Sequence, residues 1–190
     1  IDSQDQTPFL ETFKIHFLLI STYKYPQADR LNFAKEYLRK MTVKDFNFKV
    51  HSLHKNFISL SLAGNKGIHD ITVLNNLPIA ELDLSHTDIH KIRVLNSLPL
   101  TSLNLSHTHV ENLHALKQLP LKKLNLWKSN TRSLNHLEDS PLESLITSGK
   151  WADLSPLKKI KSLKQVYVSR YTYSNDYVKE YRQYFDIIFI

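Results

Sequence analysis

The sequence contains no cysteine and only three glycines among its 190 residues. The absence of cysteine excludes disulfides, thiolate catalysis and cysteine-ligated metals together. Three glycines, at positions 64, 67 and 149, are too few for the usual phosphate-binding loops, which need several of them closely spaced. Disulfide-stabilised, thiol-dependent and P-loop proteins are therefore excluded as classes.

Long apolar runs are also absent. None reaches the ~18 residues that a membrane-spanning helix needs, and the longest candidate, residues 13–20, is interrupted by Lys14 and His16. We expect no membrane contact within this sequence. Because the chain opens with Ile1, we expect a processed product or an excised fragment, with any signal or anchor lying outside it. The net charge of +7 suits an acidic partner without requiring one.

The middle of the sequence repeats with a constant period. Leu103-Asn104-Leu105 returns as Leu124-Asn125-Leu126, and prolines recur at positions 78, 99, 120 and 141. A Leu-x-Leu alternation predicts a strand, and the three-residue spacing that follows it predicts a helical or 3-10 turn. One strand and one turn cannot bury their own leucines, so stacked units must share a core and a parallel sheet. The strand pairs are Leu60/Leu62, Leu82/Leu84, Leu103/Leu105, Leu124/Leu126, Leu145/Thr147 and Val166/Val168.

These units resemble the leucine-rich-repeat family in its short bacterial form, with the pattern LxxLxLSHTxIxxIxxLxxLP over roughly residues 57–169. The resemblance implies an α/β solenoid: a right-handed coil with a parallel sheet on its concave face and short helical or 3-10 turns on its convex face. The family usually has Asn or Cys after each strand, where this chain has Asn65, Thr87, Thr108 and Ser129 and then Lys150. Lys cannot replace that hydrogen-bonding role, so we expect an irregular fifth coil.

The repeats contain almost no aromatic residues, which gather at the two ends of the chain. Open coils expose leucines at both ends, and terminal units must cover them. We therefore expect an N-terminal cap over 1–56, repeats over 57–169 and a C-terminal cap over 170–190. Within the caps the sequence predicts helices starting near 7–11 and over 27–41, a hairpin of 46–52 and 57–63, a helix over 174–185 and a strand over 186–190.

A helix, a hairpin and then 21-residue coils ending in Pro-Leu is a layout similar to the repeat regions attached to bacterial receptor-type serine/threonine kinases. No kinase motif occurs in this chain: it has no glycine-rich loop, no His-Arg-Asp and no Asp-Phe-Gly. If the parent protein is a kinase, this segment does not transfer phosphate. The resemblance is compatible with a cytoplasmic or an extracytoplasmic bacterial location.

Two histidine arrangements could indicate chemistry: Ser-His pairs indicate catalysis, and stacked histidines indicate metal binding. Ser85-His86 and Ser106-His107 are Ser-His pairs, but they are equivalent repeat positions, so we expect no catalysis. His86 and His107 should stack ~4.8 Å apart on adjacent strands, close enough to chelate a metal ion. The next residue in that column is the cationic Lys128, and two ligands are fewer than a zinc site uses. A solvated histidine pair is the preferred reading, metal binding stays open, and no cofactor is expected.

The basic stretch 158–164 could suggest nucleic acid, but its charges fall on the convex turn and return loop of one coil. Without stacking aromatics between them, we expect a solvated face and no nucleic-acid partner.

The residues beside each Leu-x-Leu pair should face away from the core. They are mostly small and polar until three neighbouring strands present Trp127, Ile146 and Tyr167, with Lys123 and Asn125 beside them as a polar rim. Exposed Trp and Tyr are enriched at binding hot spots. We therefore expect these five residues to bind a protein or peptide on the concave face. The alternatives are that a cap, a partner protomer or a tilted fifth coil covers them, and that the module is a structural or oligomerising spacer.

Overall fold

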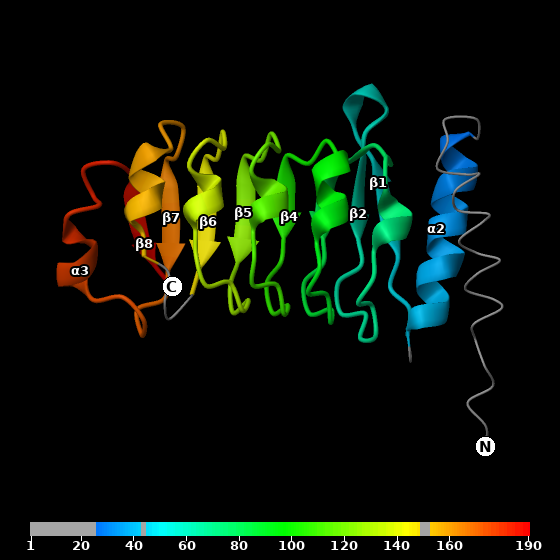
Figure 1. The fold of residues 1–190 in the computed structure, drawn as a ribbon, viewed down its shortest axis with the longest axis horizontal. Coiled ribbons are helices and arrows are strands. Elements are labelled where there is room, and N and C mark those ends of the chain that lie inside the picture. Colours follow the sequence, from blue (N-terminus) through cyan, green and yellow to red (C-terminus); the bar gives the residue numbers. More distant parts are fainter. Residues whose placement is uncertain (1–25, 43–44, 149–152) are drawn as a thin grey trace, which may run out of the picture.

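A computed structural model describes residues 26–42, 45–148 and 153–190. Its strands form one eight-stranded sheet in which spatial order follows chain order, so successive coils lie side by side along the long axis (Figure 1). This is an α/β repeat solenoid. The strands are β1 (Lys49–Ser52), β2 (Ile58–Ser61), β3 (Ile79–Asp83), β4 (Ser102–Asn104), β5 (Lys123–Leu126), β6 (Ser144–Thr147), β7 (Gln165–Val168) and β8 (Asp186–Phe189).

The repeat strands pair parallel and in register. Leu82 lies beside Leu103, Leu103 beside Leu124, and Leu124 beside Leu145. All four of these leucines are buried in one continuous core, since each coil covers the leucines of the last. The prediction of one parallel strand per coil is confirmed.

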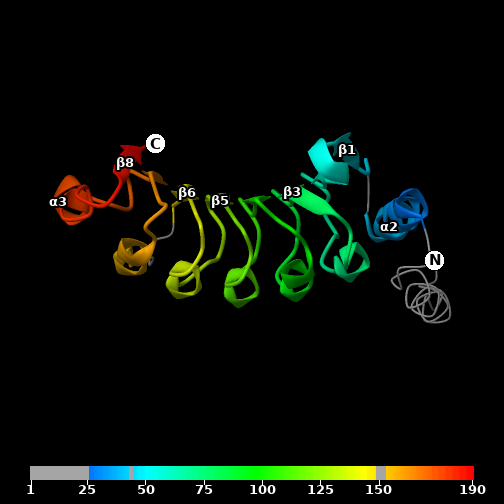
Figure 2. The ribbon, with the colours of Figure 1, turned by 90° about the horizontal axis from the view of Figure 1, so that it is seen from above.

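Short 3-10 helices close the coils on the opposite side from the strands. The 3-10 helices of the coils lie on one side of the sheet in Figure 2, and among the described residues no element covers the other side of β4 to β7. We call that uncovered side the open sheet face. Each 3-10 helix of the coils directly follows a buried Ile or Leu or contains one, which joins the turns to the core. Their bounds are η2 (Thr72–Leu74), η3 (Arg93–Ser97), η4 (His114–Leu116), η5 (Asn135–Leu137) and η6 (Ser155–Lys159), and η1 (His54–Asn56) connects β1 to β2.

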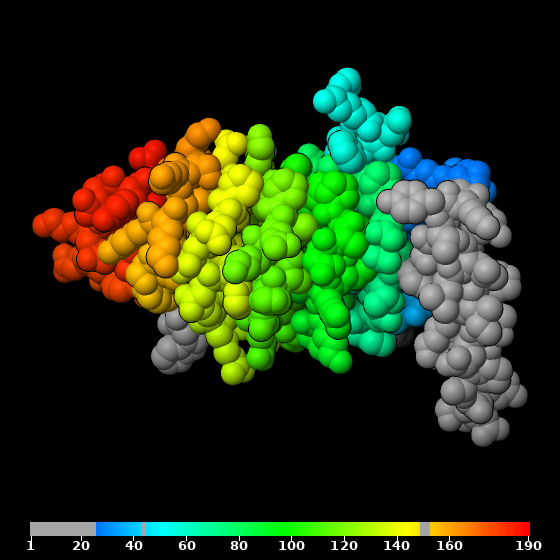
Figure 3. Space-filling model, turned by 45° about the horizontal axis from the view of Figure 1, so that its top comes forward, coloured from blue at the N-terminus to red at the C-terminus, as the bar shows by residue number. Residues whose placement is uncertain are grey.

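The N-terminal elements match the predicted helix and hairpin. Helix α2 (Gln27–Met41) buries Ala34 and Leu38 against the first coil, and Arg30 donates to the carbonyls of Asn75 and Asn76. Strands β1 and β2 pair antiparallel, and their hairpin (cyan) projects from the body of the molecule in the space-filling view (Figure 3). The helix start predicted near 7–11 lies outside the described residues. No helix within the described ranges is long and apolar enough to cross a membrane.

The C-terminal helix is shorter than predicted. Helix α3 covers only Asn175–Lys179, with the Ser174 hydroxyl accepting a hydrogen bond from the Tyr177 N–H as its cap. The chain then continues in turns, which place Tyr181 and Phe185 in the core. The expectation of one helix over 174–185 is therefore wrong, because burying these rings at the end of the core takes precedence over helix propensity.

Strand β8 extends the repeat by one more period. Its residues pair parallel with β7, and each partner is 21 positions later: Gln165 lies beside Asp186 and Tyr167 beside Ile188. The last strand thus occupies the same position as the strand of a seventh coil.

The hydrogen-bonding column after the strands works with Thr and Ser in place of Asn. The side chains of Asn65, Thr87 and Thr108 each donate to the carbonyl three residues earlier, as does the Ser129 hydroxyl to Leu126. Lys150 lies outside the described residues. In the same coil, Leu154 and Leu157 are buried although each comes one residue early in the repeat.

Candidate binding surface on the open sheet face

Three apolar side chains lie side by side on the open sheet face. Ile146 on β6 is the register partner of Tyr167 on β7, which is the partner of Ile188 on β8. Each alternates with buried neighbours, such as Leu145 and Val166, and therefore points to the opposite side of the sheet. All three are half-buried and none belongs to the core cluster. We call Ile146, Tyr167 and Ile188 the apolar row.

Ile188 is not among the predicted site residues. Its signal is present in the sequence, because it follows Tyr167 at the same interval at which Tyr167 follows Ile146. In the centre of the row, the Tyr167 hydroxyl donates to Oε1 of Gln165 at 3.2 Å, on the same strand. That bond restrains the ring position and leaves the ring itself half-exposed.

The same strand position carries polar side chains in the preceding coils. Asp83, Asn104 and Asn125 each accept a hydrogen bond from the backbone N–H two residues later, at 2.9–3.0 Å. These bonds turn the chain out of the strand. The predicted rim residue Asn125 therefore has a structural task, since its Oδ1 is occupied by the Trp127 N–H.

The other predicted rim residue is available to a partner. Lys123 is exposed on β5, between Ser102 and Ser144 in the neighbouring strands. It forms no ion pair within the described part of the chain.

Trp127 lies one residue beyond β5 and is half-buried. Its column, two residues after the outward-facing strand position, also holds Ser85, Ser106 and Ser169, which the alternation predicts to face away from the core; all three are buried. The reason is that this column follows the strand end, where the chain turns sharply towards the next segment. Trp127 is therefore not a member of the apolar row, since the β5 residue beside Ile146 is Asn125.

The structure brings His86 and His107 together. Their rings stack with centroids 4.1 Å apart and planes within 14°. Both residues have positive φ, as do Gly64 and Lys128 at the equivalent positions. Partial burial, His86, Lys128 and Lys66 lower the pKa of His107, so protonation of this ring is disfavoured. Within the described ranges, no group of three or more His, Asp or Glu side chains could hold a metal.

The two Ser-His pairs do not form catalytic arrangements. Ser85 and Ser106 are buried, and each uses its N–H for the turn bond to Asp83 or Asn104. No hydrogen bond joins either serine to its following histidine in the part of the chain that the structure describes. The histidine that follows each serine is therefore not placed as its hydrogen-bonded base in this structure.

The basic stretch 158–164 is largely neutralised by ion pairs. Lys158 lies 3.2 Å from Glu180, Lys159 lies 3.0 Å from Glu138, and Lys164 lies 2.8 Å from Glu143. The Lys164 ammonium hydrogen-bonds to Glu143 and thereby lowers the pKa of that carboxyl. This pairing supports a solvated outer face.

No protein-family model matches the chain, and no curated protein matches it. Among solved structures it resembles an internalin from Listeria monocytogenes, with a TM-score of 0.45 and 22% sequence identity. The match covers 86% of this chain and 51% of the internalin, so the chain spans about half the length of that protein.

Proposed function

We propose that this solenoid is a non-catalytic module that binds a protein or peptide on its open sheet face. The observation that carries the proposal is the apolar row, in which Ile146, Tyr167 and Ile188 are register neighbours outside the core. Core packing does not require apolar side chains there, because the same strands already bury the alternate residues. An apolar surface with no packing task favours a binding role.

The chemistry of the row suits a protein partner. A Tyr ring between two Ile side chains offers a large contact area with little conformational entropy to lose, as at interface hot spots. Lys123 supplies a free charge on β5. A broad, uncovered sheet fits an extended peptide or another folded surface better than a small molecule, which needs an enclosing pocket.

We also propose three finer features of the fold. They are the right-handed coil, the concave curvature of the open sheet face, and the covering role of the terminal elements. The cap roles are supported by the burial of Ala34 and Leu38 at one end and of Tyr173, Tyr181 and Phe185 at the other. Attachment to a bacterial receptor-type kinase rests on the helix, hairpin and coil layout alone.

Peptide selection tests the proposed function without knowledge of the natural partner. A random linear peptide library displayed on phage is selected on the wild-type chain, and the recovered peptides are titrated against two double variants. Tyr167→Ser/Ile188→Ser removes the centre and one end of the apolar row. Ser59→Ala/Glu81→Ala alters the same face in the first coils and serves as the matched control.

We expect the selected peptides to lose at least about tenfold in affinity for the first variant and to keep their affinity for the control, since hot-spot truncation costs more than ~1 kcal/mol. Both variants must first show wild-type circular dichroism and melting behaviour. Peptides that bind both variants equally well would place the binding surface elsewhere. A chain that selects no peptides at all would favour the spacer role.

A further inference from the structure

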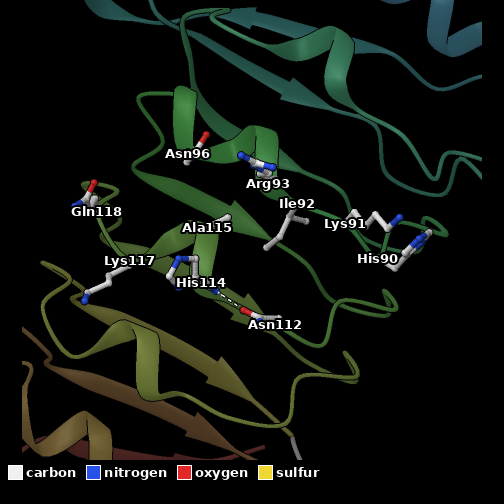
Figure 4. Close-up of a pocket in the computed structure, with 10 residues that line it drawn as sticks. All are labelled: His90, Lys91, Ile92, Arg93, Asn96, Asn112, His114, Ala115, Lys117 and Gln118. Atoms are coloured by element: carbon white, nitrogen blue, oxygen red, sulfur yellow. Dashed lines mark hydrogen bonds between the residues drawn. The ribbon is translucent and has the colours of Figure 1, made fainter.

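A second surface lies on the side of the 3-10 helices, away from the apolar row. Helices η3 and η4 belong to consecutive coils, and a groove of about 840 Å³ runs between them. Buried Ile92 and half-buried Ala115 contribute its apolar part. Figure 4 shows the lining residues, which are His90, Lys91, Ile92, Arg93, Asn96, Asn112, His114, Ala115, Lys117 and Gln118. We call this surface the basic groove.

The basic groove contains no acidic side chain. Its charged residues are Lys91, Arg93 and Lys117, and two histidines lie beside them. None of the three cations makes an ion pair within the described part of the chain. Like charges that share a groove raise its potential and attract anions.

Other cations on the side of the 3-10 helices form ion pairs in the described ranges, unlike those of the basic groove. Arg132, Lys158 and Lys159 lie on the same side of the molecule, and each contacts a glutamate from a neighbouring coil, at 3.0–3.2 Å. Lys117 stands one repeat period before Glu138, but the Oε1 of that glutamate contacts Lys159. The three groove cations therefore differ from Arg132, Lys158 and Lys159 in having no carboxylate partner within the described residues.

The three cations are spread along the groove. In Figure 4, Lys91 and His90 lie at one end, Lys117 and Gln118 at the other, and Arg93 and His114 between them. One small anion cannot contact all of them, whereas a ligand with several anionic groups can. Neutral donors are also present: Asn112 accepts the His114 N–H at 2.7 Å through Oδ1, which leaves its amide NH₂ free to donate.

We propose that the basic groove binds a small ligand that carries two or more phosphate or sulfate groups. Arg93 binds the central group through its planar guanidinium, since Arg matches tetrahedral oxyanions in a two-pronged geometry. Lys91 and Lys117 bind the outer groups as point charges. The site is independent of the proposed protein-binding face, because it lies on the opposite side of the sheet.

Titration calorimetry with tripolyphosphate tests this site on the 190-residue chain. We compare the wild type with Arg93→Gln/Lys117→Gln and with the matched control Lys158→Gln/Lys159→Gln, which removes the same charge from paired lysines. We expect one site per chain and a loss of at least about tenfold in affinity in the groove variant only. The single variant Lys117→Gln removes only one charge, at an exposed side chain, and should lower the affinity for tripolyphosphate by a smaller factor.

Two further probes separate the possible sources of the anion. A disulfated disaccharide tests sulfate against phosphate, and a short single-stranded oligonucleotide tests a nucleic-acid backbone. Binding of tripolyphosphate or of the disaccharide that depends on Arg93 supports the proposal. The probe that binds more tightly shows whether the site prefers phosphate or sulfate. Equal loss in both double variants would show attraction by the overall charge alone. That result, the absence of binding, or binding of the oligonucleotide only would overturn the proposal.

Discussion

The early and late coils use one strand position for different purposes. In the coils of β3, β4 and β5 this position holds Asp83, Asn104 and Asn125, whose side chains accept the backbone N–H that follows the strand. In β6 and β7 it holds Ile146 and Tyr167, which do not form such a bond. The later coils give up a turn-stabilising hydrogen bond and gain an apolar surface. In the late coils this position carries half-buried apolar side chains and forms no turn bond. We therefore expect it to serve partner binding there.

The largest expected effect comes from breaking the core that both groups of coils share. Leu124 is 2% exposed between Leu103 and Leu145, so Leu124→Ala should lower the free energy of unfolding by about 2–5 kcal/mol through cavity formation. Chemical denaturation measures this loss. The neighbouring exposed Lys123→Ala should leave the midpoint nearly unchanged, and equal effects of both substitutions would contradict the assignment of strand faces.

The next largest effect is expected at Asn104, where the early coils use the side chain to stabilise the turn after the strand. Asn104→Ala removes the acceptor of the Ser106 N–H, which should cost about 1 kcal/mol of stability. Asn104→Asp keeps an acceptor, as Asp83 does naturally, and should cost much less. Comparing the denaturation midpoints of these two variants tests the turn bond. If both were equally destabilised, the hydrogen bond would not be the reason for the polar residues in this column.

The strands and the core could be predicted because Leu-x-Leu alternation and a constant period allow only one set of inward positions. The outward direction of Ile146 and Tyr167 follows from the same alternation. The task of Asn125 could not be predicted, because it depends on which backbone N–H its side chain meets after the strand. The length of α3 could not be predicted either, since Tyr181 and Phe185 are equally compatible with a helix or with turns until the end of the core is in place.

A smaller effect concerns the turn that follows the strands. Lys128 has φ of 53°, in a region that disfavours L-residues, and Gly64 takes the equivalent position in the first coil. Lys128→Gly should therefore raise stability by a few tenths to about 1 kcal/mol, after the greater flexibility of glycine in the unfolded chain is deducted. Thermal melting measures the change. Lys123→Gly, within β5, should lower stability, and a loss at position 128 as well would argue against strain in the turn.

The smallest effect is a pH dependence that belongs to the early coils. Partial burial and the neighbouring cations lower the pKa of His107 below its ordinary value of 6.5. The unfolded chain therefore binds the proton more readily, so stability falls as the pH drops through the ordinary value of the group. His107→Asn, which tolerates the positive φ, should reduce the drop in melting temperature between about pH 7.5 and pH 5.5. His54→Asn, in the exposed hairpin loop, is the matched control for the loss of a histidine, and an equal change in both variants would contradict a specific role of His107.

The contrast between early and late coils is tested most directly by NMR mapping of a peptide selected on the wild-type chain. On titration of the isotope-labelled protein, the largest amide shifts are expected at Ile146, Tyr167 and Ile188 and at their neighbours in β6, β7 and β8. Residues at the same face in the early coils, such as Ser61 and Asp83, should shift little. Shifts centred on the early coils, or on the side of the 3-10 helices, would contradict the assignment of the apolar row as the binding surface.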